Sequence, residues 1–131
     1  MDNQLTVTFP GGKRVDASYK GFHIPTDQPV YQGGEGSAPA PFDLFLVSVA
    51  TCAGIYVLSF AQNRGIDMSD ASLNMTLRQS QESEPSDVMR LEIRLPAGFP
   101  EKYRKAVIKA VNGCAVKAYF EHPPTFEVVL T

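Results

Sequence analysis

The feature that most constrains this chain is an uninterrupted stretch from Leu44 to Ala61, eighteen residues without a charged side chain. By length alone, such a stretch could cross a membrane as a helix. It contains several hydroxyl side chains and Cys52, however, and neither a cluster of basic residues nor a belt of aromatic residues flanks it. We therefore expect a buried helix of a globular protein, with Pro41 in its first turn and Gly65 at its C-cap.

Alternating apolar and polar residues on both sides of this stretch predict strands. Before it, a strand over Leu5, Val7 and Phe9 turns at Pro10-Gly11-Gly12 into a second strand from Arg14 to Tyr19, and residues 21–24 can extend the sheet. After it, a strand over Leu73, Met75 and Leu77 pairs with one from Val88 to Leu95 across the polar loop at residues 82–87. The pattern predicts two antiparallel hairpins.

A second helix begins at Pro100-Glu101, where apolar side chains recur at helical spacing and the lysines take the other face. Asn112-Gly113 would cap it, and Thr125 to Leu130 predict a last strand. This order predicts one α+β domain over residues 1–131, with mainly antiparallel pairing. The long apolar helix needs more cover than these elements supply, so we expect an obligate dimer.

The charge balance excludes a strongly basic surface. The formal net charge is −2 and the pI is near 5.6, so nucleic acid and anionic lipid are not expected partners. Met1-Asp2-Asn3-Gln4 lacks the features of a secretory signal. We expect a cytoplasmic protein whose thiols start reduced.

Cys52 and Cys114 are the two cysteines, and their separation fits neither a CxxC redox motif nor a zinc site. His23 and His122 each stand alone, without the paired short spacings of a Cys2His2 site, so no zinc site is predicted. On a helical wheel, Cys52 falls on the more polar stripe of its helix, and Cys114 falls on the core-facing sector of the second helix. Both sulfurs then point inward and could meet. They are either small buried hydrophobes or a reactive pair.

A reactive Cys52 needs a group that stabilises its thiolate. The N-terminus of its own helix lies about 16 Å away, beyond the reach of the helix dipole. Arg14, near the first hairpin turn, is the candidate cation, and a solvated turn residue is the alternative. Asp43 is the candidate acid, and capping of the apolar helix is its alternative. Asp43 and Cys52 face opposite sides of an unbroken helix, so joint action requires a helix break near Pro41 or a contact across a dimer.

The segments Ser37-Ala38-Pro39-Ala40-Pro41-Phe42-Asp43-Leu44-Phe45-Leu46, Ala50-Thr51-Cys52 and Gly113-Cys114-Ala115-Val116 resemble the OsmC/Ohr family. The resemblance covers essentially the whole chain and includes the order of elements. It implies an intertwined α+β homodimer, with antiparallel sheets wrapped around long central helices and two active sites at the subunit interface. Ala115 stands where the family often has proline.

The resemblance also implies a thiol-dependent peroxidase acting on organic hydroperoxides. Cys52 matches the peroxidatic cysteine, Cys114 the resolving cysteine, Arg14 the arginine that stabilises the thiolate, and Asp43 the acid before the helix. A dithiol, lipoyl-type in one branch of the family, would regenerate the pair, and no cofactor is implied. The alternative is a binding protein of the same fold, whose apolar pocket, lined by Phe42, Phe45 and Tyr56, carries a small hydrophobic ligand.

Overall fold

The computed structural model describes residues 4–131; residues 1–3, on which part of the expectation about a signal depends, lie outside the described part. The chain forms two compact units, Met1–Val47 and Ser48–Thr131. Helix α1 (Pro41–Gln62) begins in the first unit and continues into the second. Each unit is described by itself below, and the single domain over residues 1–131 stays a prediction.

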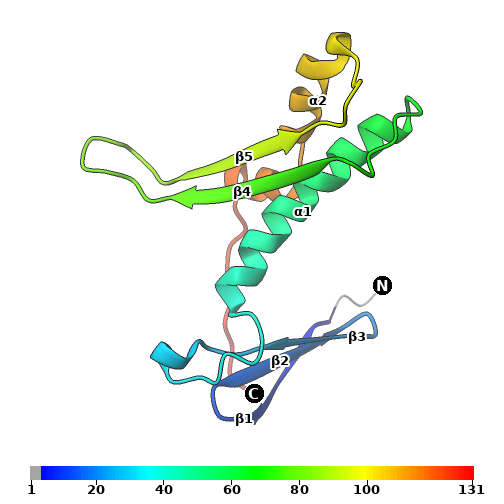
Figure 1. The fold of residues 1–131 in the computed structure, drawn as a ribbon. Helices are drawn as coiled ribbons and strands as arrows, with labels where there is room; N and C mark the ends of the chain where they lie inside the picture. The colour runs from blue at the N-terminus through cyan, green and yellow to red at the C-terminus, as the bar shows by residue number, and fades with distance from the viewer. Residues whose placement is uncertain (1–3) are drawn as a thin grey trace. The chain divides into compact units, whose positions relative to one another are not determined.

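The N-terminal unit contains a three-stranded antiparallel sheet in the order β1-β2-β3 (Figure 1). Its strands are β1 (Thr6–Gly11), β2 (Arg14–Tyr19) and β3 (Phe22–Thr26). Thr6 pairs with Ser18, and the register shifts between Thr8 and Gly11, next to the turn. The predicted first hairpin and its extension by a third strand are confirmed.

A buried carboxylate organises the loop that follows β3. Asp27 is 1% exposed and accepts hydrogen bonds from the backbone N–H groups of Gln28 (2.7 Å), Glu35 (3.3 Å) and Ser37 (3.0 Å), and from the Ser37 hydroxyl (2.6 Å). The Ser37 hydroxyl and N–H are the main cause of a pKa for Asp27 lowered to about 2. No sequence pattern pointed to Asp27, which holds in place the glycine-rich loop between β3 and α1, residues 27–40.

The predicted apolar helix is confirmed as α1 and extends a few residues beyond the charge-free stretch. At its start, Asp43 Oδ2 accepts a hydrogen bond from the backbone N–H of Ala40 at 2.9 Å, as the N3 acid of a capping box does. At its end, Gly65 adopts a φ of +66°, and the N–H of Ile66 bonds back to the carbonyl of Ala61. By length and composition alone α1 could cross a membrane, which is also true of the core helix of a globular protein.

The C-terminal unit pairs a second hairpin with short helices beside α1 (Figure 1). These elements are β4 (Ser72–Arg78), β5 (Val88–Arg94), the 3₁₀ turn η2 (Glu101–Tyr103), α2 (Arg104–Val111) and α3 (Ala115–Glu121). The antiparallel ladder of β4 and β5 runs from Ser72 opposite Arg94 to Arg78 opposite Val88. The α+β class with antiparallel sheets is confirmed, whereas α3 was not predicted.

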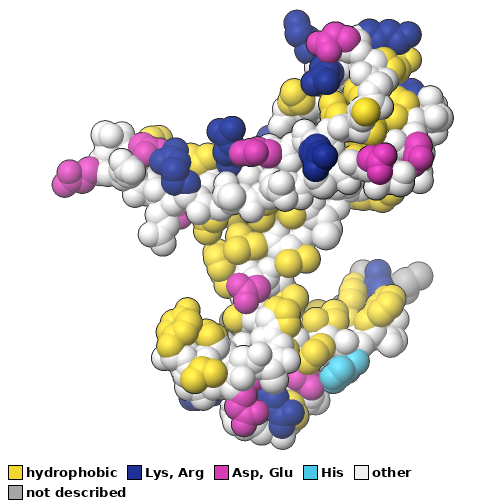
Figure 2. Space-filling model, viewed as in Figure 1, with side chains coloured by type: hydrophobic (Ala, Val, Ile, Leu, Met, Phe, Trp, Pro, Cys, Tyr) yellow, Lys and Arg dark blue, Asp and Glu magenta, His cyan; other side chains and the backbone are white. Residues whose placement is uncertain are grey.

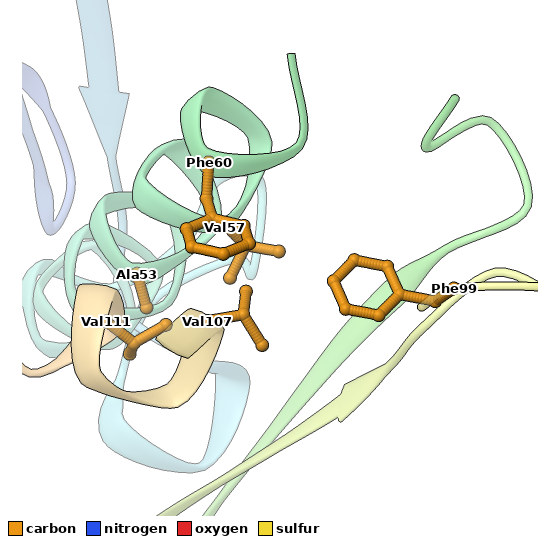
Figure 3. Close-up of a cluster of buried hydrophobic side chains, with 6 residues drawn as sticks. All are labelled: Ala53, Val57, Phe60, Phe99, Val107 and Val111. Atoms are coloured by element: carbon orange, nitrogen blue, oxygen red, sulfur yellow. The ribbon is translucent and has the colours of Figure 1, made fainter. Parts of the chain in front are cut away.

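The core of the C-terminal unit lies between α1 and α2. Figure 3 shows Ala53, Val57 and Phe60 of α1 pointing toward Val107 and Val111 of α2. Phe99 and half-buried residues of the hairpin complete the cluster. Burial of these apolar side chains stabilises the packing of α2 against α1.

The burial expected for α1 is found on one face only. Its buried side chains are Ala53, Val57, Phe60 and Ala61. On other faces Val47 is 53% and Ile55 52% exposed, and Figure 2 shows hydrophobic side chains on the visible surface of this helix. The single chain leaves an apolar surface without cover, as the sequence analysis anticipated.

The predicted last strand from Thr125 to Leu130 is wrong for the single chain. No strand includes these residues in the described range 4–131, and Phe126, Val128 and Leu130 are 91%, 89% and 99% exposed. A strand forms only when a neighbouring strand satisfies its backbone N–H and C=O groups. The segment has the alternating apolar pattern of a strand, but within the described residues it pairs with no other strand.

Candidate functional site

Cys52 lies midway along α1, next to the buried core residue Ala53. Its neighbour Ala53 is 1% exposed and faces α2, which fixes the rotation of the helix around this point. Cys52 itself is half-buried. A helix that is held on one side by packing thus presents a partly accessible thiol at a defined place.

The turn after α2 positions Cys114 next to Cys52. The N–H of Gly113 bonds to the carbonyl of Ala110 at 3.1 Å, and the N–H of Cys114 bonds to that of Val111 at 3.1 Å. These bonds end α2 tightly, and Cys114 becomes the N-cap residue of α3. Its side chain is 4% exposed. The predicted capping by Asn112-Gly113 and the inward orientation of this thiol are confirmed.

The two cysteines are in hydrogen-bond contact. The thiol of Cys114 donates to the sulfur of Cys52, and the backbone N–H groups of Val116 and Ala115 donate to it as well. The Cys114 hydrogen bond is the largest cause of a lowered pKa of Cys52; the two N–H groups add to the lowering, and partial burial opposes it. The lowered pKa raises the fraction of Cys52 present as thiolate, which is the nucleophilic form of cysteine.

The groups that lower this pKa come from α3, which the sequence analysis missed. From the sequence, the N-terminus of the helix that carries Cys52 is too distant to lower its pKa, so a cation was expected in that role. The run Ala115–Glu121 is short and follows a Gly-Cys pair, so it showed too few turns for helical periodicity to stand out. The available signal was Asn112-Gly113, which ends one helix and allows another to begin after it.

Arg14 and Asp43, the other two predicted site residues, belong to the N-terminal unit, whereas both cysteines belong to the C-terminal unit. Arg14 is the first residue of β2, and its Nε donates to the carbonyl of Gly11 at 3.4 Å across the hairpin turn. Asp43 caps α1 through Ala40, the alternative weighed from the sequence. Their action on Cys52 stays a prediction.

Each unit also contains a pocket of its own. In the C-terminal unit, a cavity of about 160 Å³ is lined mainly by apolar side chains of α1, β4 and β5: Gly54, Val57, Leu58, Met68, Ala71, Ser72, Leu73 and Ile93. In the N-terminal unit, the glycine-rich loop and the start of α1 surround a cavity of about 380 Å³ that includes Tyr31, Phe42 and Asp43. Neither lining contains Cys52. Within residues 4–131, no group of three or more His, Cys, Asp or Glu side chains is arranged to hold a metal ion.

Comparison with protein families gives a match over residues 34–129 to the family described as OsmC-like protein. The matched range contains Asp43, Cys52 and Cys114 and leaves out the hairpin that carries Arg14. A comparison with the curated proteins gives no match.

Several solved structures share the fold. A Psychrobacter arcticus protein named for osmotic stress and detoxification response has a TM-score of 0.73 at 24% identity, covering 90% of this chain and 87% of that one. An organic hydroperoxide resistance protein, OsmC, from Legionella pneumophila has a TM-score of 0.61 at 18% identity, covering 92% and 89%. An OsmC-like protein from Mycoplasma pneumoniae has a TM-score of 0.68 at 17% identity, covering 94% and 89%. At these identities the likeness is one of fold.

Proposed function

Since the chain belongs to the OsmC-like protein family, we propose that it is a thiol-dependent peroxidase that reduces organic hydroperoxides. The observation that carries the proposal is the hydrogen bond from Cys114 to Cys52. It lowers the pKa of the Cys52 thiol and leaves a second thiol next to it. The name of the Legionella relative, an organic hydroperoxide resistance protein, supports the same substrate class.

The proposed reaction uses both sulfurs in turn. The Cys52 thiolate attacks the terminal oxygen of the hydroperoxide, so an S–O bond forms, the O–O bond breaks, and the alkoxide leaves and takes up a proton to become an alcohol. Cys52 is then a sulfenic acid. Cys114 attacks its sulfur, which forms the disulfide and releases water. An external dithiol reduces the disulfide by exchange and is itself oxidised.

The hydrogen bonds at Cys52 suit this sequence of steps. Before the attack they lower the pKa of the Cys52 thiol and so increase its thiolate fraction. After it, the buried Cys114 thiol is already next to the sulfur that it must attack, so little chain movement precedes the disulfide. In a cytoplasmic location, cellular dithiols would keep the pair reduced between turnovers.

We also propose that the protein acts as a homodimer. The exposed apolar side chains of α1 and of residues 126–130 need cover, and the edges of both sheets are open to a further strand. Because α1 is unbroken from Pro41 to Gln62, a contact across such a dimer is the remaining way for Asp43 to act with Cys52. Arg14 would reach Cys52 by the same route.

Turnover assays test the proposal. Reduced wild-type protein with a dithiol reductant should consume an alkyl hydroperoxide catalytically. Cys52→Ser should abolish consumption, because a hydroxyl is not ionised at neutral pH. Cys114→Ser should give one rapid turnover and a sulfenic acid at Cys52 that a dimedone-type probe labels. Equal consumption by wild type and Cys52→Ser would refute the proposal.

The binding-protein alternative predicts a different outcome. A ligand retained in native mass spectrometry, with unchanged ligand binding in Cys52→Ala and no peroxide consumption by the wild type, would favour it. The same purified samples serve both assays.

A further inference from the structure

The surface around α2 is basic. Figure 2 shows Lys and Arg side chains gathered where Figure 1 places this helix. Residues 102–120 contain five Lys or Arg residues and no Asp or Glu, whereas the whole chain has a net charge of −2. The basic residues are Lys102, Arg104, Lys105, Lys109 and Lys117. Surfaces that are only solvated usually mix both signs of charge, so this segregation points to an interaction.

Two of these lysines lie on the side of α2 that faces away from the core. Val107 is buried against α1, and Lys105 and Lys109, two residues to either side of it, lie about half a turn away from the buried face. Neither lysine forms an ion pair within residues 4–131, and Ile108 between them is 59% exposed. Lys105, Ile108 and Lys109 make up what we call the lysine face.

The turn that carries Cys114 directly continues this basic helix. Cys114 donates its backbone N–H to the carbonyl of Val111, the last residue of α2, at 3.1 Å. Lys109 precedes Cys114 by five residues, about one and a half helical turns. Lys117, three residues after Cys114, donates its Nζ to Asn112 Oδ1 at 3.1 Å, which holds it near the end of α2. Cations therefore flank Cys114 on both sides along the chain.

We propose that the lysine face docks an acidic protein whose dithiol reduces the disulfide of Cys52 and Cys114. This inference rests on the proposed function, which requires such a reductant. A thiolate of the docked partner attacks one sulfur of the disulfide and forms a mixed disulfide, and the partner's second thiol then displaces the sulfur of this chain. The partner is oxidised to a disulfide, and Cys52 and Cys114 receive its two electrons and two protons.

Other occupants fit the lysine face less well. A helix that binds a lipid surface buries an apolar face in it, but Val107 and Val111 of α2 are already buried in the core. Lysine is depleted from the core of protein interfaces, so the proposed homodimer would leave the lysine face open. Surface charge of one sign speeds the encounter with an oppositely charged protein. That property suits a reductant, because it must bind and leave in every turnover.

The test measures how fast dithiol peptides reduce the disulfide. Oxidised protein is made with diamide and mixed with a synthetic Cys-Gly-Gly-Cys peptide flanked by glutamates or, as a neutral match, by glutamines. At low ionic strength we expect the glutamate peptide to react with the wild type about tenfold faster than the glutamine peptide. Added salt should remove the difference, because it screens exposed charges. Equal rates of the two peptides would overturn the proposal.

Charge reversal tests where the peptide docks. The double variant K105E/K109E should lose the preference for the glutamate peptide. K13E/K20E, which makes the same change of charge on turns of the N-terminal sheet, should retain it. Dithiothreitol, an uncharged dithiol, should reduce all three proteins at the same rate. A preference retained in K105E/K109E would overturn the proposal, and the comparison of the two peptides on the wild type needs no variant to fold.

Two further outcomes separate this inference from its alternatives. Equal peptide rates together with cosedimentation of the wild type, but not of K105E/K109E, with phosphatidylglycerol vesicles would assign the lysine face to a membrane and overturn the proposal. The reduction assay needs no peroxide, so a preference for the glutamate peptide without peroxide consumption would refute the proposed function alone. Peroxide consumption driven by dithiothreitol, with equal peptide rates, would refute this inference alone.

Discussion

Cys114, at the start of α3, donates a hydrogen bond to the sulfur of Cys52, midway along α1. Two helices from distant parts of the sequence thereby meet at a pair of thiols. One is half-buried and has a lowered pKa, and the other is buried. In the proposed function, Cys52 would be the nucleophile and Cys114 the group that traps its oxidised form.

The Cys114 thiol should be the main support of the Cys52 thiolate, because its hydrogen bond is the largest cause of the lowered pKa. We expect Cys114→Ala, which removes the donor, to raise the pKa of Cys52 more than Cys114→Ser, which keeps a hydroxyl donor. The pH dependence of Cys52 alkylation measures both. A pKa that is the same in the two variants would show that the contact does not support the thiolate.

The helices and strands with a long, regular pattern of apolar residues could be predicted from the sequence. A strand whose pairing depends on another segment could not. The charge-free stretch predicted α1, and strict alternation predicted β4 and β5. The alternation at Thr125 to Leu130 is equally clear, yet it formed no strand because pairing needs an edge that the segment does not contact within its chain. The alternation of apolar and polar residues shows that a segment can form a strand, but the strand forms only where another strand is available to pair with it.

For the candidate site, the placement of the cysteine side chains could be predicted from the sequence, but the backbone groups around them could not. The helical wheel placed Cys52 on the more polar stripe of its helix and Cys114 on a core-facing sector, and the burial of Cys114 confirms the second placement. It did not reveal the donors Ala115 and Val116, because a backbone N–H leaves no trace in residue type. Arg14 was chosen on the assumption that only a cation could lower the pKa of Cys52, whereas peptide N–H groups also do so.

Asp27 should make stability depend on pH in the acid range. Its pKa is about 2 in the folded protein against an ordinary 3.8, so its contribution is present above 3.8 and is lost as the pH falls from there toward 2. Asp27→Asn should lower the melting temperature by several degrees at pH 6 and by much less near pH 2. The exposed control Asp70→Asn should change it little. A pH-independent difference between wild type and Asp27→Asn would contradict this role.

Gly34 should be intolerant of a side chain because the loop closes tightly around it. A Cβ at this position would collide with the backbone carbonyl of Gln28 and lie 2.8 Å from Asp27 Oδ1. Gly34→Ala should therefore cost about 1–3 kcal/mol of unfolding free energy in urea titrations. At Gly54 a Cβ would meet nothing within 4 Å, so Gly54→Ala is the matched control and should be neutral or stabilising. Wild-type stability of Gly34→Ala would show that the loop is not packed in this way.

The exposed C-terminal segment should contribute to the proposed dimer. If the segment pairs as a strand in the dimer, Val128→Lys places a charge on the face that Phe126 and Leu130 would share, and Glu127→Lys, on the opposite face, is the control. Light scattering should give twice the 14.3 kDa chain mass for wild type and control, and a smaller average mass or aggregation for Val128→Lys. A wild-type protein that stays monomeric at micromolar concentration would contradict the dimer.

The most direct test of the account is a single-turnover experiment on the thiol pair. Fully reduced protein receives one equivalent of an alkyl hydroperoxide, and free thiols are counted before non-reducing digestion and peptide mass spectrometry. The account predicts the loss of both thiols, one equivalent of alcohol, and a peptide in which Cys52 and Cys114 are joined by a disulfide. Unchanged thiols with intact hydroperoxide would contradict it.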